Sequence, residues 1–183
     1  MPDTSRFLTA LGRVIRSLSG SGRGSSTDAA PRPSAEGDEL MPGRSGPSAT
    51  VELEPSAIRR VRFSYTPDRD GEPDPGEVVW TWVPFEEHDG RGKDRPVVVV
   101  AAGAPGEFLA VQLTSARRDR DADAIALGAG PWDPQGRPSW ARIDRVFRVH
   151  ADGVRREAAS LDRDRYAQVV DALAGRYGWS SAR

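Results

Sequence analysis

The chain has 183 residues, with 26 basic and 27 acidic side chains, a formal net charge of −1 and no cysteine. This composition excludes disulfides, thiol nucleophiles and cysteine-based zinc sites. It also excludes the global basic field that marks many nucleic-acid-binding domains, so any anion site must be a local cluster. The two histidines, His88 and His150, lie far apart in the sequence, and the sequence predicts neither a metal site nor a cofactor.

The first 50 residues have two contrasting parts. Residues 1–19 are predicted to form an amphipathic helix, because from residue 3 onwards apolar side chains recur at helical spacing with arginines among them. Such a helix could bind a membrane surface or a partner. A lone helix of this length is only marginally stable in water, which favours a marginal or docked helix over membrane association. Residues 20–50 are rich in Gly, Ser, Pro and Ala and are predicted to be a disordered linker.

Residues 51–183 are predicted to form one folded domain. Apolar runs favour strands, and the clearest are Glu77–Val83, Pro96–Ala101, Phe108–Leu113 and Ala141–His150. The run Glu77–Val83 is apolar on both faces, which is typical of a strand that curls into a barrel or is covered on both sides. A helix is expected from about Asp162, a plausible N-cap, to Tyr177, with Gly178 ending it. The predicted fold is a small β-barrel or strongly bent sheet with a C-terminal helix across it.

No apolar run reaches the roughly 20 residues that span a bilayer. The N-terminus has no continuous apolar core of the kind found in secretory signals. The expected location is therefore the cytoplasm.

Arg95 and Thr114 are the first candidate site residues, because each lies at the edge of a predicted strand. An arginine can clamp a phosphate with two parallel hydrogen bonds, and a threonine hydroxyl can donate a third. Together they would stabilise negative charge at phosphorus without a metal. From residue types and spacing alone, an exposed arginine and a threonine that ends a strand are the commoner explanation.

Three further groups of residues have two interpretations each. The arginines Arg117, Arg118, Arg120, Arg142, Arg145 and Arg148 could follow a phosphate backbone, or could be solvated charge neutralised by interleaved aspartates. Among the tryptophans, Trp80 and Trp82 are expected to be core or interface anchors, whereas Trp132, in a loop, could stack on a base or pack internally. His88 could act as an acid or base, but a loop histidine without a visible partner is more often exposed.

Three segments together resemble the MazF/PemK-like toxin family of type II toxin-antitoxin systems, particularly its actinobacterial branch. They are GEVVWTWVPFEE from Gly76, GKDRPVVVV from Gly92 and FLAVQLTS from Phe108. The similarity covers residues 74–177. The resemblance implies an SH3-like β-barrel closed by a C-terminal helix, usually a homodimer, and often an antitoxin partner. It also implies metal-independent cleavage of single-stranded RNA, in which the 2′-hydroxyl attacks the adjacent phosphate and leaves a 2′,3′-cyclic phosphate and a 5′-hydroxyl.

By this resemblance Arg95 and Thr114 are the catalytic residues. The residues predicted to bind RNA are Ser115, Arg117, Arg118 and Arg145. The chain departs from the family pattern in the loop Glu86–Asp94, whose four acidic side chains would repel RNA unless they face away from it. It also departs at Arg145, where the family usually has glutamine. The alternative is a non-catalytic SH3-like module that binds nucleic acid or protein.

Overall fold

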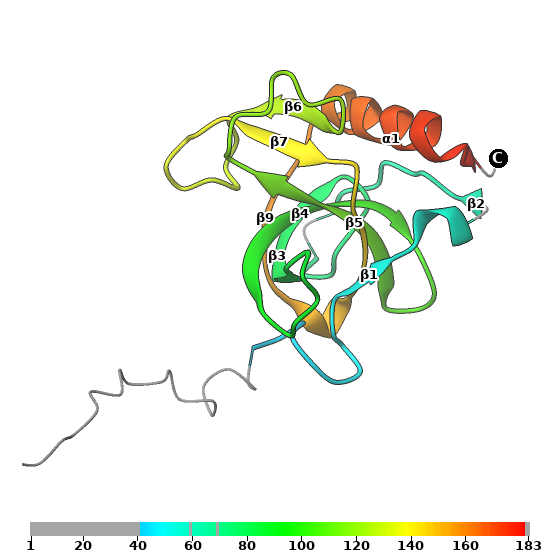
Figure 1. The fold of residues 1–183 in the computed structure, drawn as a ribbon, viewed down its shortest axis with the longest axis vertical. Coiled ribbons are helices and arrows are strands. Elements are labelled where there is room, and N and C mark those ends of the chain that lie inside the picture. Colours follow the sequence, from blue (N-terminus) through cyan, green and yellow to red (C-terminus); the bar gives the residue numbers. More distant parts are fainter. Residues whose placement is uncertain (1–40, 59, 69, 182–183) are drawn as a thin grey trace, which may run out of the picture. The chain divides into compact units, whose positions relative to one another are not determined.

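The computed structural model describes residues 41–58, 60–68 and 70–181, all of which lie in the unit Ser34–Arg183 (Figure 1). The helix predicted for residues 1–19 and residues 20–40 of the predicted linker lie outside the described residues. The strands are β1 Val51–Leu53, β2 Arg60–Val61, β3 Glu77–Pro84, β4 Gly92–Ala102, β5 Glu107–Thr114, β6 Ala124–Gly128, β7 Ser139–Arg142, β8 Val146–His150, β9 Val154–Ser160 and β10 Ser180–Ser181. One α-helix, α1 Arg163–Tyr177, and two 3-10 turns, Pro55–Ala57 and Ala151–Gly153, complete the described elements.

Residues 41–50, which the sequence analysis placed in the linker, are folded onto the sheet. The N–H of Thr50 donates to the carbonyl of Gly43 at 2.7 Å, and the hydroxyls of Thr50 and Thr81 lie 2.8 Å apart. A Cβ on Gly43, whose φ is +79°, would lie 2.6 Å from the Thr81 hydroxyl oxygen, so a glycine is needed there. The glycine that suggested flexibility in the sequence permits this close packing.

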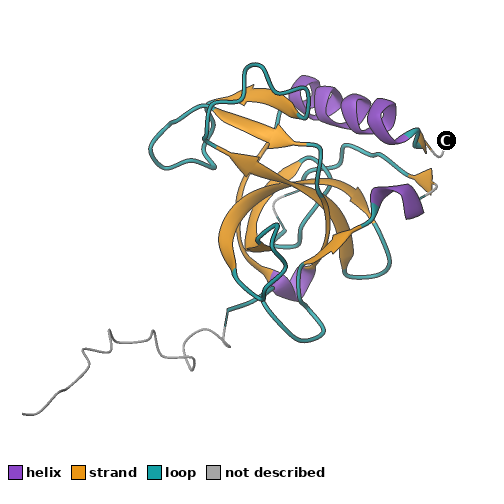
Figure 2. Ribbon diagram, in the orientation of Figure 1, coloured by secondary structure: helices purple, strands orange, loops and turns teal. Residues whose placement is uncertain are grey.

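The strands form one strongly bent antiparallel sheet in the order β1-β8-β5-β4-β3-β9 (Figure 2). The hairpin β6-β7 continues from the far end of β5, and β10 pairs in parallel with β2. The prediction of a mainly β fold with one C-terminal helix is confirmed. Within the described strands no pairing joins β1 to β9, so the closed barrel is not confirmed.

The sheet is buried on both faces, as the pattern of β3 predicts. On one face Val78, Val98 and Leu113 belong to a large apolar cluster that includes the inner side of α1. On the other face Val79 and Val97 belong to a second cluster, completed by Val83, Val99, Ala110, Phe147 and Val149. The alternation of side chains along a strand assigns neighbouring valines of β3 and β4 to opposite clusters.

Helix α1 is fixed at its start, its centre and its end. The carboxylate of Asp162 accepts the N–H of Arg165 at 2.8 Å, which confirms the predicted N-cap, and Gly178 ends the helix in the left-handed conformation. The Tyr166 hydroxyl lies 2.7 Å from the carbonyl oxygen of Val100 in β4. Burial raises the pKa of Tyr166 to about 12, so the phenol stays a hydrogen-bond donor. These contacts hold the helix against the sheet beside β6 and β7 (Figure 1).

Candidate functional site

Arg95 and Thr114 face each other where β4 and β5 separate. The ladder between these strands includes the pair Val97 and Gln112, and Arg95 and Thr114 each lie two residues beyond that pair. Because side chains alternate along a strand, both residues lie on the same face as Val97 and Gln112. The strands separate here because β5 changes partner and Thr114 pairs with Trp140 of β7, while Arg95 pairs with Thr81 of β3. The separation leaves an opening between Arg95 and Thr114, which we call the mouth.

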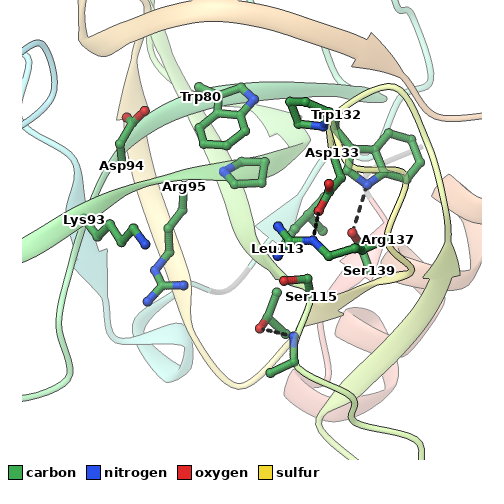
Figure 3. Close-up of a pocket in the computed structure, with 14 residues that line it drawn as sticks. Trp80, Lys93, Asp94, Arg95, Leu113, Ser115, Trp132, Asp133, Arg137 and Ser139 are labelled. Atoms are coloured by element: carbon green, nitrogen blue, oxygen red, sulfur yellow. Dashed lines mark hydrogen bonds and ion pairs between the residues drawn. The ribbon is translucent and has the colours of Figure 1, made fainter. Parts of the chain in front are cut away.

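Two cavities meet at this mouth, and Arg95 and Thr114 line both. The first cavity, of about 340 Å³, lies on the side of Trp80 and is covered by the loop that contains Trp132 and Arg137 (Figure 3). The second cavity, of about 590 Å³, lies towards the acidic loop and is lined by Phe85, Glu86, Glu87, Arg91, Gln112, Arg118, Arg142 and Arg145 in addition. A chain that passed through the mouth would contact both cavities.

Arg95 is the uncompensated cation of this site. Five arginines line the second cavity, and four of them are paired with carboxylates: Arg91 with Asp89, Arg118 with Asp121, Arg142 with Asp144 and Glu86, and Arg145 with Glu52. Arg95 makes no hydrogen bond or ion pair with any described residue. Burial, and then the positive charges of Arg145 and Arg142, lower the pKa of Arg95, and the negative charge of Glu86 offsets only part of this shift. An anion at the mouth would relieve both effects.

The Thr114 hydroxyl is oriented by the turn that follows β5. Its oxygen accepts the N–H of Ala116 at 3.1 Å, so its proton is available to a second acceptor. Gln112, on the same face of β5, is 4% exposed, and its Oε1 has no hydrogen-bond partner among the residues described. The site thus presents a guanidinium, a hydroxyl and a side-chain amide. Nothing in the sequence pattern singles out Gln112, although its position two residues before Thr114 places it on the same face.

The acidic loop borders the site and does not face away from it. Glu86 and Glu87 line the second cavity, and the carboxylate of Glu86 accepts a hydrogen bond from Arg142 at 3.0 Å. His88 has a positive φ of +49° and lies 2.9 Å from the Glu52 carboxylate. It is exposed, as predicted, but it has a partner that lies in β1, far away in the sequence. The loop is therefore anchored beside the mouth by the ion pair between Glu86 and Arg142, which Arg142 shares with Asp144.

Arg145, a predicted RNA-binding residue, is held inside the domain. Its side chain is 8% exposed and donates to Glu52 through Nε at 2.8 Å and to the Pro84 carbonyl at 3.0 Å. Its guanidinium carbon lies 4.9 Å from the centre of the Phe147 ring. Since these partners use most of its donors, the geometry favours a structural role for Arg145 over direct contact with RNA.

The remaining predicted RNA-binding residues are distributed around the mouth. Ser115 lines the first cavity and Arg118 lines the second. Arg117 is paired with Asp119 and lines neither of these two cavities. Trp132 is 2% exposed, so it belongs to the core, whereas Trp80 is half-buried and lines the first cavity. Trp80, expected as a core or interface anchor, thus forms part of a cavity wall.

The Glu52–Arg145 pair predicts a specific pH dependence of stability. Burial raises the pKa of Glu52, but hydrogen bonds from Arg145 and His88 outweigh burial and hold the pKa below its usual value of 4.5. Because the folded-state pKa is depressed, this contribution to stability is present above the unfolded pKa and is lost as the pH falls through the folded value. Urea unfolding from about pH 6 to about pH 3 should show a shallower loss of stability in Glu52→Gln than in the wild type. Equal slopes would contradict the assignment.

Together the fold and the site define a small, mainly β domain with a mouth, lined by Arg95 and Thr114, at the point where two strands separate. The family model of the PemK-like, MazF-like toxin of type II toxin-antitoxin system matches residues 74–175. The chain belongs to this family, whose members are generally endoribonucleases. The matched residues include Arg95, Thr114 and most of α1.

Similar solved structures include two MazF-type proteins that cover this domain. The MazE–MazF crystal structure (Form-II) from Deinococcus radiodurans is 23% identical, with a TM-score of 0.47, and the match covers 59% of this chain and 97% of that chain. An endoribonuclease in complex with its cognate antitoxin from a mycobacterial species is 20% identical, with a TM-score of 0.46, and the match covers 60% of this chain and 99% of that chain. No curated protein matches the sequence. No helix among the described residues is long and apolar enough to cross a membrane.

Proposed function

We propose that this chain is a metal-independent endoribonuclease that cleaves single-stranded RNA at the mouth between β4 and β5, as the toxin of a toxin-antitoxin system. The observation that carries the proposal is the position of Arg95. It is the one arginine of the second cavity without a carboxylate partner among the described residues, and it lies opposite the Thr114 hydroxyl. An uncompensated, partly buried guanidinium beside a free hydroxyl proton is suited to hold a phosphate.

The proposed reaction is attack by the 2′-hydroxyl of one nucleotide on the phosphorus that follows it. The 2′-hydroxyl loses its proton as the new P–O bond forms, and the P–O5′ bond breaks as a proton reaches the departing 5′-oxygen. The products are a 2′,3′-cyclic phosphate and a 5′-hydroxyl. Arg95 and Thr114 donate hydrogen bonds to the non-bridging oxygens, where negative charge builds up in the transition state.

The proposal extends to the surroundings of the site. Ser115 and Arg118 contact the RNA on either side of the phosphate, whereas Arg145 holds the wall of the second cavity. The active form is a homodimer of SH3-like barrels in the cytoplasm, and an antitoxin covers the mouth. The family membership supports the antitoxin partner.

The test is incubation of the purified full-length chain with a randomised pool of single-stranded RNA in the presence of EDTA. A single-stranded DNA pool and a duplex RNA serve as controls, because the first lacks the 2′-hydroxyl and the second cannot enter a narrow mouth. We expect cleavage of the RNA pool alone. An uncut RNA pool would overturn the proposal.

The acidic loop supports a second candidate function, a non-catalytic binding module. Glu86 and Glu87 line the second cavity, where their charge opposes RNA. Retention of the RNA pool without cleavage in the same experiment would favour this alternative.

A further inference from the structure

The first cavity has the walls of a site for a planar ring. Trp80 of β3 and Pro96 of β4 are paired across the sheet, and Leu113 of β5 and Pro134 of the covering loop complete the apolar lining. The volume of about 340 Å³ is at the lower end of the range for small-molecule sites, so it suits one base rather than several nucleotides. Trp80 is half-buried and lines this cavity, and an aromatic ring in a cavity wall can stack on a base.

The loop that covers this cavity is held rigidly by its own contacts. Trp132 anchors the loop in the core, and its Nε1–H donates to the Ser139 hydroxyl at 3.1 Å. A Cβ on Gly130 would lie 2.2 Å from the Trp132 ring, so the loop packs against this tryptophan as closely as a glycine permits. The Asp133 carboxylate, 8% exposed, accepts the N–H of Gln135 at 2.8 Å. These contacts form a fixed platform at the edge of the cavity.

Arg137 projects from this platform, with its side chain 54% exposed and oriented by one ion pair. Its Nε donates to the Asp133 carboxylate at 2.9 Å, while its two Nη groups have no hydrogen-bond partner among the residues that the structure describes. Figure 3 shows Arg137 and Arg95 on opposite sides of the cavity, with Trp80 above them. A guanidinium that is fixed through Nε presents its two Nη groups as a parallel pair of donors.

A parallel pair of donors beside a stacking wall selects guanine among the four RNA bases. Guanine offers two adjacent acceptors, O6 and N7, to a bidentate arginine, whereas adenine places an amino group where guanine has O6. Cytosine and uracil lack N7. A phosphate would also accept from Arg137, but it would make no use of the aromatic and aliphatic walls.

We propose that the first cavity binds a guanine base of single-stranded RNA, next to the phosphate held by Arg95 and Thr114, with Arg137 as the residue that determines specificity. The inference rests on the proposed function, because Arg95 and Thr114 line the mouth shared by both cavities. It predicts that the preferred cleavage sites have a guanosine at one side of the broken bond.

The test compares cleavage of RNA oligonucleotides that differ only in the base at that position. The wild type should cut the guanosine substrate fastest, and Arg137→Ala should reduce this preference about 10- to 100-fold while the best non-guanosine substrate keeps its rate within about twofold. Arg137→Lys keeps the charge but lacks the paired donors, so it should lose the preference as well. The matched control is Arg148→Ala, an exposed arginine of β8 that lines neither cavity.

A binding measurement separates failure of the subsite from failure of the activity. Guanosine 5′-monophosphate should shift the Trp80 indole N–H resonance at lower concentration than adenosine 5′-monophosphate, and Arg137→Ala should abolish the difference. Three outcomes would overturn the subsite and leave the proposed activity intact. They are RNA cleavage without a guanosine preference, an unchanged preference in Arg137→Ala, and an equal loss of cleavage rate on every sequence in Arg137→Ala. Arg137-dependent binding of the guanine nucleotide in a protein that cuts no RNA would support the subsite and overturn the activity. Neither binding nor cleavage would overturn both.

Discussion

Arg95→Ala should reduce RNA cleavage by about 100- to 1000-fold while the fold stays intact. The reason is that Arg95 supplies the uncompensated positive charge at the mouth, and no neighbouring arginine can replace it. The arginines around it are already paired with carboxylates. The measurement is the single-turnover rate on a fluorogenic single-stranded RNA, with circular dichroism to verify the fold.

Three further variants sharpen this prediction. Thr114→Val should lose cleavage by a similar factor, whereas Thr114→Ser keeps the hydroxyl and should retain most of the rate. Arg148→Ala removes an arginine that lines neither cavity and should cleave at the wild-type rate. If Arg95→Ala or Thr114→Val cut RNA as fast as the wild type, the reaction would have to take place elsewhere on the chain.

Arg145→Met should lower the free energy of unfolding by about 2–4 kcal/mol. This loss arises because Glu52, whose side chain is 21% exposed, would keep a partly buried carboxylate without its main partner. Urea unfolding at neutral pH measures the change. The matched control is Arg148→Met in β8, three residues further along the chain, where the side chain is 45% exposed and the change should stay within about 0.5 kcal/mol.

A double-mutant cycle separates the ion pair from the rest of the Arg145 environment. Removing Glu52 as well, in Glu52→Gln/Arg145→Met, should restore part of the lost stability, with a coupling of about 1–3 kcal/mol. Loss of RNA affinity in Arg145→Met without any loss of stability would instead show that Arg145 contacts RNA directly.

The sequence predicted those parts of the fold that depend on local pattern. The two apolar faces of Glu77–Val83 predicted a strand covered on both sides, and the structure divides its valines between two clusters. The apolar face of α1 and its N-cap at Asp162 could also be predicted, because both depend on residues within a few positions of one another. Closure of a barrel could not be predicted from local sequence pattern, because it depends on contacts between the first and last strands of the sheet.

The candidate site could be predicted only through the family resemblance. The residues that surround it could not be predicted from the sequence. Residue types alone favoured an unremarkable arginine and threonine, whereas the register of β4 and β5 places Arg95 and Thr114 opposite each other. The partner of Arg145 is Glu52, 93 positions earlier in the chain, so no local spacing could reveal that pair. The burial of Trp132 could not be predicted for the same reason, because it depends on how the covering loop folds.

The most direct test of the account is cleavage of an RNA oligonucleotide that carries a single 2′-deoxy nucleotide at the mapped cut site. Attack by the neighbouring 2′-hydroxyl predicts that this substitution blocks cleavage at that linkage and at no other. It also predicts that the unmodified oligonucleotide yields a 2′,3′-cyclic phosphate and a 5′-hydroxyl, with EDTA present throughout. Cleavage across the 2′-deoxy linkage at the wild-type rate would contradict it.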